Sequence, residues 1–157
     1  MIDKAPEIKY LPNDIFGTTV QQLLRDGTDV EFTVTGNSMW PLLKHGRDKV
    51  ALTLCEGCDI KKGDIILFEA VPSKYLLHRV MRVSADSFES AGDFNCFRDG
   101  RFNKGCVIGR AVKITRKGKV YKTGFGLLKI FSFLWIGLFV VRKPLLKLFR
   151  FIAGIKK

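Results

Sequence analysis

Three residue types that together carry out nucleophilic hydrolysis occur in order along this chain. Ser38 lies in the segment Gly36-Asn37-Ser38-Met39-Trp40-Pro41, His78 follows in a largely apolar stretch, and the acids Asp93 and Asp99 come later. A serine hydroxyl is a weak nucleophile that needs a base within hydrogen-bonding reach and a group that orients the base. If these side chains converge, the chain has the parts of a serine peptidase.

The residues around Ser38 favour a strand that ends in a sharp turn. Gly36 permits a backbone conformation that other residues rarely adopt, and Pro41 fixes the turn that follows. Backbone N–H groups near the serine are then available to a developing oxyanion. We therefore expect Asn37 and Met39 to contribute to oxyanion stabilisation or substrate binding. The residues alone leave an alternative, in which Gly-Asn-Ser is an ordinary structural turn.

The four cysteines do not define a metal site. Cys55 and Cys58 have the spacing of a zinc knuckle or a redox pair, whereas Cys96 and Cys106 are separated by nine residues. No βαβ pattern surrounds the first pair, as a thioredoxin-like site would require. We expect reduced or half-buried cysteines, no metal ligands and no organic cofactor.

Hydrophobic periodicity predicts a mainly β fold with one short helix in front. Asn13-Asp14 can cap a helix that runs to about Arg25 and carries apolar residues on one side. Residues 1–12 are expected to be irregular, and residues 93–104 to form a loop. Runs of apolar or alternating residues predict strands at 30–35, 49–54, 65–70, 75–83, 87–91, 106–115 and 120–122.

The positive charge of the chain is confined to its C-terminal part. The 157 residues carry a formal net charge of +12, yet residues 1–112 hold as many acids as bases, whereas residues 113–157 hold 12 Lys and Arg and no acid. These bases alternate with Phe, Leu, Ile and Trp, which is typical of a segment at a lipid surface. Because a nucleic-acid-binding arm would not normally carry so many bulky apolar side chains, nucleic acid is disfavoured as a partner.

The tail contains two apolar pieces. Residues 125–141 are apolar apart from glycines, one serine and one lysine, but the stretch without charge is only about twelve residues, and a spanning helix needs roughly 20. Residues 145–155 carry apolar side chains at helical spacing with bases on the other side. We expect 123–157 to form a membrane-associating tail of hydrophobic and amphipathic helices, and 1–122 to form the peptidase-like β domain. One alternative is a helical hairpin packed on the β domain or on a twin chain, and another is that the basic tail binds in the groove of a partner protein.

The N-terminus does not resemble a signal peptide. Asp3, Lys4, Glu7 and Lys9 fall within the first twelve residues, and no apolar core follows them. We therefore expect a membrane-associated protein whose β domain lies on the cytoplasmic face, where thiols stay reduced.

Three short motifs follow one another along the β domain. They are Ser38-Met39-Trp40-Pro41, Gly63-Asp64-Ile65-Ile66-Leu67-Phe68 and Gly92-Asp93-Phe94-Asn95. In this order and spacing they resemble the motifs of the type I signal peptidase and LexA-like serine peptidase superfamily, and the lead-in from Val34 to Met39 is more similar to the LexA branch. The resemblance covers roughly residues 30–115 and implies a signal-peptidase/LexA-like β fold.

The residue types at the site resemble one branch of that superfamily. Bacterial signal peptidases use a lysine base before an Arg-Val or Arg-Ile pair, whereas this chain has His78 before Arg79-Val80, which is similar to the endoplasmic-reticulum and archaeal branch. That resemblance implies Ser38 as the nucleophile and His78 as the general base and acid. It favours Asp99 for orienting the imidazole and Asp93 for bracing the loop, although an Asp-Gly pair also favours a simple turn.

The chain departs from the family pattern at several points. Gly36 stands where many signal peptidases have a hydroxyl residue that donates to the oxyanion, and Gly46-Arg47-Asp48 has one residue more than the usual Gly-Asp. The apolar segment lies at the C-terminus, whereas signal peptidases are anchored by an N-terminal span. LexA-like members carry an N-terminal DNA-binding unit, and residues 1–29 offer at most one helix.

The sequence therefore predicts a serine endopeptidase that resembles signal peptidase and cleaves leader or signal-type peptides at a membrane by a Ser-His-Asp mechanism. The resemblance implies small side chains before the cut, and the peptide is expected to add as a strand beside the site. The alternative is a non-catalytic or self-processing β domain, tethered to the membrane, that binds a partner peptide. A DNA-responsive repressor is disfavoured.

Overall fold

The computed structural model describes residues 7–8, 13–55, 59–124, 126–139, 141–142, 144 and 146. These residues form the strands β1 (Glu7–Ile8), β2 (Val30–Thr33), β3 (Asp48–Leu54), β4 (Ile65–Val71), β5 (Lys74–Val83), β6 (Ser87–Ala91), β7 (Gly100–Asn103), β8 (Val107–Arg116) and β9 (Lys119–Lys122), with the helices α1 (Asn13–Arg25) and α2 (Gly126–Gly137) and the 3₁₀ turn η2 (Lys104–Cys106).

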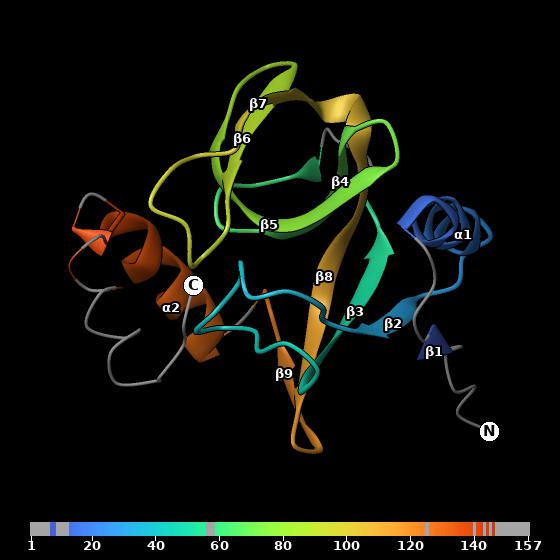
Figure 1. The fold of residues 1–157 in the computed structure, drawn as a ribbon, viewed down its shortest axis with the longest axis horizontal. Helices are drawn as coiled ribbons and strands as arrows, with labels where there is room; N and C mark the ends of the chain where they lie inside the picture. The colour runs from blue at the N-terminus through green and yellow to red at the C-terminus, as the bar shows by residue number, and fades with distance from the viewer. Residues whose placement is uncertain are drawn as a thin grey trace.

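The strands make one coiled sheet with a helix at either side (Figure 1). Its order is β1-β2-β3-β8-β4-β5-β6-β7, and β9 pairs with β8. Neighbouring strands are antiparallel except β1 and β2, which are parallel. The prediction of a mainly β fold with a short N-terminal helix is confirmed, and α1 has the predicted bounds.

Two short strands correct the sequence-based assignment. Glu7–Ile8, expected to be irregular, pairs with β2, and Gly100–Asn103, expected to lie in a loop, pairs with β6. Both are hard to detect from periodicity: the first is only two residues long, and in the second only Phe102 is even half-buried. They are strands because neighbouring strands hydrogen-bond to them, and their own sequences show no apolar pattern.

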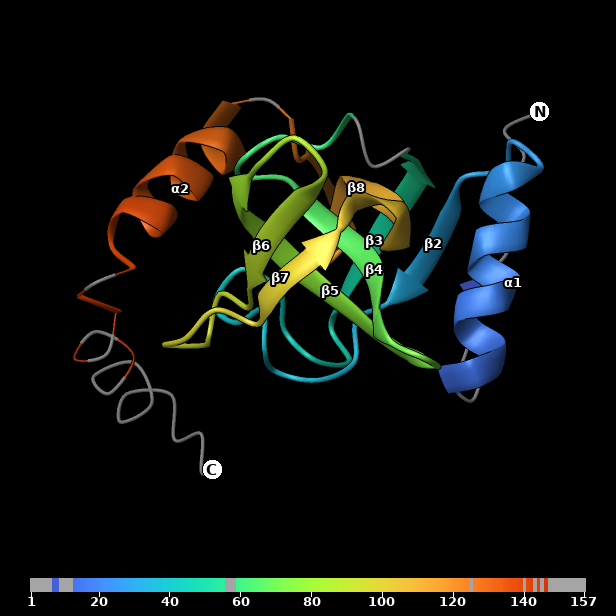
Figure 2. The ribbon, with the colours of Figure 1, turned by 90° about the horizontal axis from the view of Figure 1, so that it is seen from above.

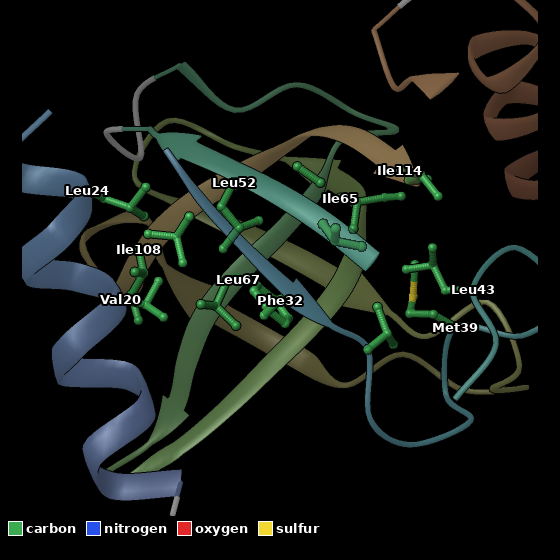
Figure 3. Close-up of a cluster of buried hydrophobic side chains, with 14 of the residues drawn as sticks. Val20, Leu24, Phe32, Met39, Leu43, Leu52, Ile65, Leu67, Ile108 and Ile114 are labelled. Carbon is green, nitrogen blue, oxygen red and sulfur yellow. The ribbon is translucent and has the colours of Figure 1, made fainter. Parts of the chain in front are cut away.

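The main core lies between α1 and the strands β2, β3, β4 and β8 (Figure 3). Val20 and Leu24 lie one helical turn apart on α1 and are 0% and 1% exposed, as expected for the apolar stripe of an amphipathic helix. Each such burial stabilises the fold by about 1.5–3 kcal/mol. A second cluster forms around Phe68, Phe88 and Phe102, whose rings make edge-on and tilted contacts. These two cores fix the strands that carry the predicted site residues.

The helix α2 packs on the side of the sheet opposite α1 (Figure 2). Leu128 and Phe131 contact the main core, and Trp135 is 5% exposed. The other side of the helix and the turn after it present large exposed apolar side chains, which we call the exposed α2 face: Leu127, Ile130, Phe133, Leu134, Leu138 and Val141. No helix in the described part of the chain is long and apolar enough to cross a bilayer. The helix expected at 145–155 lies outside the described residues except for Leu146.

Candidate active site

Ser38, His78 and Asp99 form a hydrogen-bonded series. The Nε2 atom of His78 lies 2.9 Å from the Oγ atom of Ser38, and its Nδ1 atom lies 2.6 Å from Oδ2 of Asp99. An ionised carboxylate only accepts hydrogen bonds, so Nδ1 carries the proton donated to Asp99, and Nε2 accepts the hydroxyl proton of Ser38. In this arrangement an imidazole can take the proton from a serine nucleophile.

The turn that carries Ser38 begins just after β2. Gly36 has a φ of 82°, in the left-handed region that favours glycine, and its N–H donates to Nδ1 of His45 at 3.0 Å. The N–H of Trp40 donates to the carbonyl of Asn37 at 3.1 Å and closes the turn. The sharp exit expected at Gly36 is therefore present, and it leaves the Ser38 side chain half-buried.

The pairing of β5 changes at His78. This residue faces Ile66 of β4, whereas pairing with β6 begins one residue later, at Arg79 opposite Ala91. His78 therefore lies where β6 stops covering the second edge of β5. Its side chain is 5% exposed, so the imidazole is shielded from water on most sides while it contacts Ser38.

Asp99 is held just before β7 by two contacts with Ser90. Its N–H donates to the Ser90 carbonyl at 2.9 Å, and the Ser90 hydroxyl donates to its Oδ2 atom at 2.8 Å. Burial acts to raise the pKa of the Asp99 carboxyl, but hydrogen bonds from His78, Ser90 and Asn95 and the electrostatic attraction of His78 outweigh it, and the pKa lies below its ordinary value. Asp99 is therefore ionised at neutral pH and able to orient the imidazole.

Asp93 belongs to a different ion pair. Its two carboxylate oxygens accept hydrogen bonds from Nε and Nη2 of Arg79 at 2.8 and 2.7 Å, and both side chains are almost completely buried. Arg79 also donates to the Gly63 carbonyl at 3.0 Å and to the Ser132 hydroxyl. The Arg79–Asp93 pair thus joins β5, the loop after β6 and α2. Within the described residues, the Asp93 carboxylate is bound by Arg79 and not by His78.

The loop 92–95 closely approaches the nucleophile. The N–H of Phe94 donates to the Ser38 carbonyl at 2.8 Å. A Cβ atom on Gly92 would lie 2.6 Å from that same carbonyl oxygen and 3.1 Å from Nε2 of His78. Because these separations are too short for a side chain without displacement, the loop can lie this close to the site only with glycine at position 92.

The C-terminal segment supports this loop from outside. The indole Nε1 of Trp135 donates to the Asp93 carbonyl at 3.1 Å, and the guanidinium of Arg142 donates to the carbonyls of Gly92 at 3.2 Å and Trp135 at 2.9 Å. Arg142 lies over the Trp135 ring at 5.1 Å from its centroid, and burial lowers its pKa. Part of the segment expected to form a membrane tail therefore positions the loop beside the site.

Several of these residues were not singled out from the sequence. Ser90, Trp135 and Arg142 were not assigned a role, and Arg79 was noted only as the neighbour of His78. The sequence offered one indication of a role for the C-terminal segment: Trp135 lies within the apolar run, and Arg142 is the first base after that run. Ser90 carries no sequence signal, because its contact with Asp99 depends on the path of the intervening loop.

Asn37 and Met39 contribute differently from each other. Asn37 is exposed, whereas the Met39 side chain is 2% exposed and packs in the main core. Within the described residues, the backbone N–H groups of Ser38 and Met39 make no hydrogen bond. These two backbone donors are therefore available to a carbonyl oxygen held beside Ser38, and the expected contribution of Asn37 stays a prediction.

Cys55 and Cys106 belong to the second core cluster rather than to the hydrogen-bonded series. Cys55 is buried in the second core cluster, and Cys58 lies outside the described residues. Burial raises the pKa of the Cys106 thiol. Among the side chains that the structure describes, no group of His, Cys, Asp and Glu is arranged to hold a metal ion.

No family model matches the sequence, and the comparisons with curated proteins and with solved structures found no match either.

Proposed function

We propose that this chain is a membrane-associated serine endopeptidase in which Ser38, His78 and Asp99 perform the reaction. The observation that carries the proposal is the unbroken hydrogen-bonded series from the Ser38 hydroxyl through His78 to the Asp99 carboxylate, with 2.9 and 2.6 Å separations. Each residue has the chemistry its position requires: a nucleophile, a base whose other nitrogen is fixed, and an ionised acid. The sequence motifs that resemble signal peptidase support the same roles.

The reaction begins with acyl transfer to the enzyme. Oγ of Ser38 attacks the carbonyl carbon of a peptide bond while its proton passes to Nε2 of His78. Asp99 stabilises the imidazolium through Nδ1, and the backbone N–H groups of Ser38 and Met39 stabilise the oxyanion. The C–N bond then breaks as Nε2 returns the proton to the leaving amine, and an acyl ester remains on the serine.

Hydrolysis of the ester completes the cycle. A water molecule attacks the ester carbonyl and gives a proton to Nε2 of His78. The tetrahedral intermediate collapses, the bond to Oγ breaks, and Ser38 regains its proton while the carboxylic acid product leaves. The same imidazole and the same backbone donors serve both halves of the reaction.

Covalent labelling tests this proposal. A fluorophosphonate probe forms a bond between its phosphorus and an activated serine oxygen and releases fluoride. We expect the wild type to be labelled, Ser38→Ala not to be labelled, and His78→Ala to react at least ~100-fold more slowly. Ser87→Ala is the matched control, because Ser87 is a half-buried serine of β6 outside the series. A folded wild type that binds peptides but is neither labelled nor cleaves them would overturn the proposal in favour of the non-catalytic alternative.

We also propose that an anionic lipid surface binds the exposed α2 face. The face presents six large apolar side chains from 40% to 84% exposed, which is unusual for surface left in water. Residues 113–157 include 12 basic side chains and no acid. Arg142 is buried and Arg116 pairs with Asp48, but the remaining bases still give this part of the chain a positive charge that complements anionic headgroups. The helix would lie in the plane of the interface with its other side on the β domain.

Vesicle binding tests whether the exposed α2 face binds anionic lipid specifically or whether any exposed apolar residue would cause binding. We expect co-sedimentation with vesicles of phosphatidylglycerol and much weaker binding to pure phosphatidylcholine. The double variant Leu127→Glu/Leu134→Glu should lose the binding, whereas Val71→Glu should retain it, because Val71 is a 55% exposed apolar residue at the end of β4. Equal binding by both variants would contradict the proposal.

A further inference from the structure

A cavity of about 200 Å³ lies directly beside Ser38 and His78. Most of the side chains around it are apolar, and they come from elements distant in sequence, including Phe16 of α1, Phe32 of β2 and Leu77 of β5. An engineered apolar cavity of roughly 150 Å³ is large enough to bind benzene. The cavity beside the nucleophile therefore has room for a whole aromatic ring, which a methyl side chain would leave mostly empty.

The helix α1 forms one wall of the cavity. The rings of Phe16 and Phe32 meet edge-on with centroids 5.1 Å apart. The ring of Tyr75 lies against the helix backbone at Gly17, since a Cβ atom there would be 1.9 Å from Cζ of the tyrosine. Glycine at this helical position thus lets the Tyr75 ring sit against α1, and the ring bounds the cavity on that side.

The strand edges beside the cavity suit an extended peptide. Residues 76–78 of β5 pair with β4 on one side, and β6 joins the other side only from Arg79. Across the cavity, β2 pairs with β3 on one edge and, at Glu31 and Phe32, with β1 on the other. The open strand edge beside the cavity is therefore that of β5 at residues 76–78. A peptide added as a strand would bind the main chain here and would direct alternate side chains into the cavity and away from it.

We propose that this cavity binds a large apolar side chain, of the size of a benzyl group, next to the scissile bond of the substrate. The proposal rests on the proposed peptidase function and replaces the small side chains that the family resemblance implies with a different substrate class. Tyr75 is the residue that sets the depth of the cavity, because its ring is held by α1 and borders the space. Ser38 and His78 at the cavity rim place the reacting carbonyl beside the bound side chain.

Two peptidyl diphenyl phosphonates that differ only in the side chain next to phosphorus, benzyl or methyl, test the size of this site. Each labels an activated serine as Oγ bonds to phosphorus and phenoxide leaves. We expect the benzyl compound to label Ser38 at least ~10-fold faster, since even one methylene in an apolar pocket changes rates by about that factor. Equal rates, or a faster methyl compound, would overturn the proposal.

A change at Tyr75 tests which residue sets the depth. Tyr75→Ala should raise the rate with a naphthylmethyl phosphonate relative to the benzyl one by ~10-fold. Tyr121→Ala, which removes the same side chain from the exposed strand β9, should leave that ratio unchanged. If Tyr75→Ala remains reactive towards the fluorophosphonate but keeps the wild-type ratio, Tyr75 does not set the depth.

A binding measurement keeps this inference separate from catalysis. Ser38→Ala can be titrated with pairs of peptides that carry Phe or Ala at one position, with that position moved along the peptide from pair to pair. We expect one pair in which the Phe peptide binds at least ~10-fold more tightly than the Ala peptide. If the fluorophosphonate fails to label the wild type while this preference holds, the peptidase proposal fails and the cavity assignment stands. If labelling succeeds but no position prefers Phe, only the cavity assignment fails.

Discussion

The indole Nε1 of Trp135 donates a hydrogen bond to the backbone carbonyl of Asp93 at 3.1 Å, although the two residues are 42 positions apart in the chain. Asp93 is next to Gly92, which touches the nucleophile turn, and its carboxylate is bound by Arg79 beside His78. The α2 helix is therefore part of the framework that holds the hydrogen-bonded series. The same helix presents the exposed α2 face on one side and contacts the 92–95 loop through Trp135 on the other.

Loss of the indole donor should slow the reaction without removing any reacting group. Trp135→Phe keeps an aromatic ring but leaves the buried Asp93 carbonyl without its partner, at a cost of about 1–3 kcal/mol in stability. We expect fluorophosphonate labelling to slow several-fold, because the 92–95 loop is less firmly held against Ser38. Tyr121→Phe is the control, since it also removes a polar group from an aromatic ring but lies on exposed β9. Wild-type labelling by Trp135→Phe would show that the loop does not need this contact.

Gly92→Ala should strongly slow covalent labelling of Ser38 while leaving the fold intact. The added Cβ atom would lie 2.6 Å from the Ser38 carbonyl oxygen and 3.1 Å from Nε2 of His78, so the loop or the imidazole must move. A displacement of about 1 Å at a reacting group can cost ~100-fold in rate, and we expect at least that loss in labelling with an unchanged circular dichroism spectrum. Gly124→Ala is the matched control, because its Cβ would have nothing within 4 Å. Labelling of Gly92→Ala within a few-fold of wild type would contradict the assigned close approach.

The positions of the main elements followed from local sequence patterns. The predicted helix from Asn13 to Arg25 is present with the same bounds, because a capping pair and an apolar stripe are both local signals. The strands around His78 were likewise detectable from runs of apolar residues. The short strand Gly100–Asn103 was missed, since an edge strand with mostly exposed side chains has no apolar periodicity to detect.

Some residues of the site could likewise be identified from the local sequence, whereas others depend on contacts between distant segments. The motif around Ser38 and the histidine at position 78 could be selected from residue type and spacing. The choice between Asp93 and Asp99 depended on the family resemblance. The two acids are six residues apart in a loop, and no local sequence feature indicates which carboxylate faces His78. The contacts of Trp135 and Arg142 with the loop join segments far apart in sequence, and an apolar run alone does not indicate which side of its helix packs.

The buried ion pair of Arg79 and Asp93 should be costly to break from either side. Arg79→Met leaves the Asp93 carboxylate buried without its counter-charge, and Asp93→Ala does the same to the guanidinium. Breaking such a pair typically costs about 3–5 kcal/mol, whereas replacing both partners with apolar residues costs less. We expect the double variant to be more stable in urea unfolding than the sum of the two single changes predicts.

A surface pair provides the comparison for that measurement. Arg98 and Glu89 form an ion pair in which the arginine side chain is 46% exposed, and Arg98→Met should cost less than about 1 kcal/mol. If the Arg79→Met change is as mild as this one, the buried pair does not brace the loop as we infer.

Acid should destabilise the fold through two carboxyl groups whose pKa values are lowered. Burial acts to raise the pKa of Asp48, but hydrogen bonds from Arg47, the Lys44 N–H and Arg116 outweigh it, and Asp99 behaves likewise through His78. A carboxyl with a lower pKa in the folded state than in the unfolded state binds protons more readily when unfolded. Its contribution to stability is therefore complete above the unfolded pKa of about 4 and is lost as the pH falls through the folded value.

We expect the free energy of unfolding to decrease with falling pH below about pH 4. The change Asp48→Asn should flatten that decrease, and the exposed-site control Asp86→Asn should not; the same slope in both variants would contradict the assignment to Asp48.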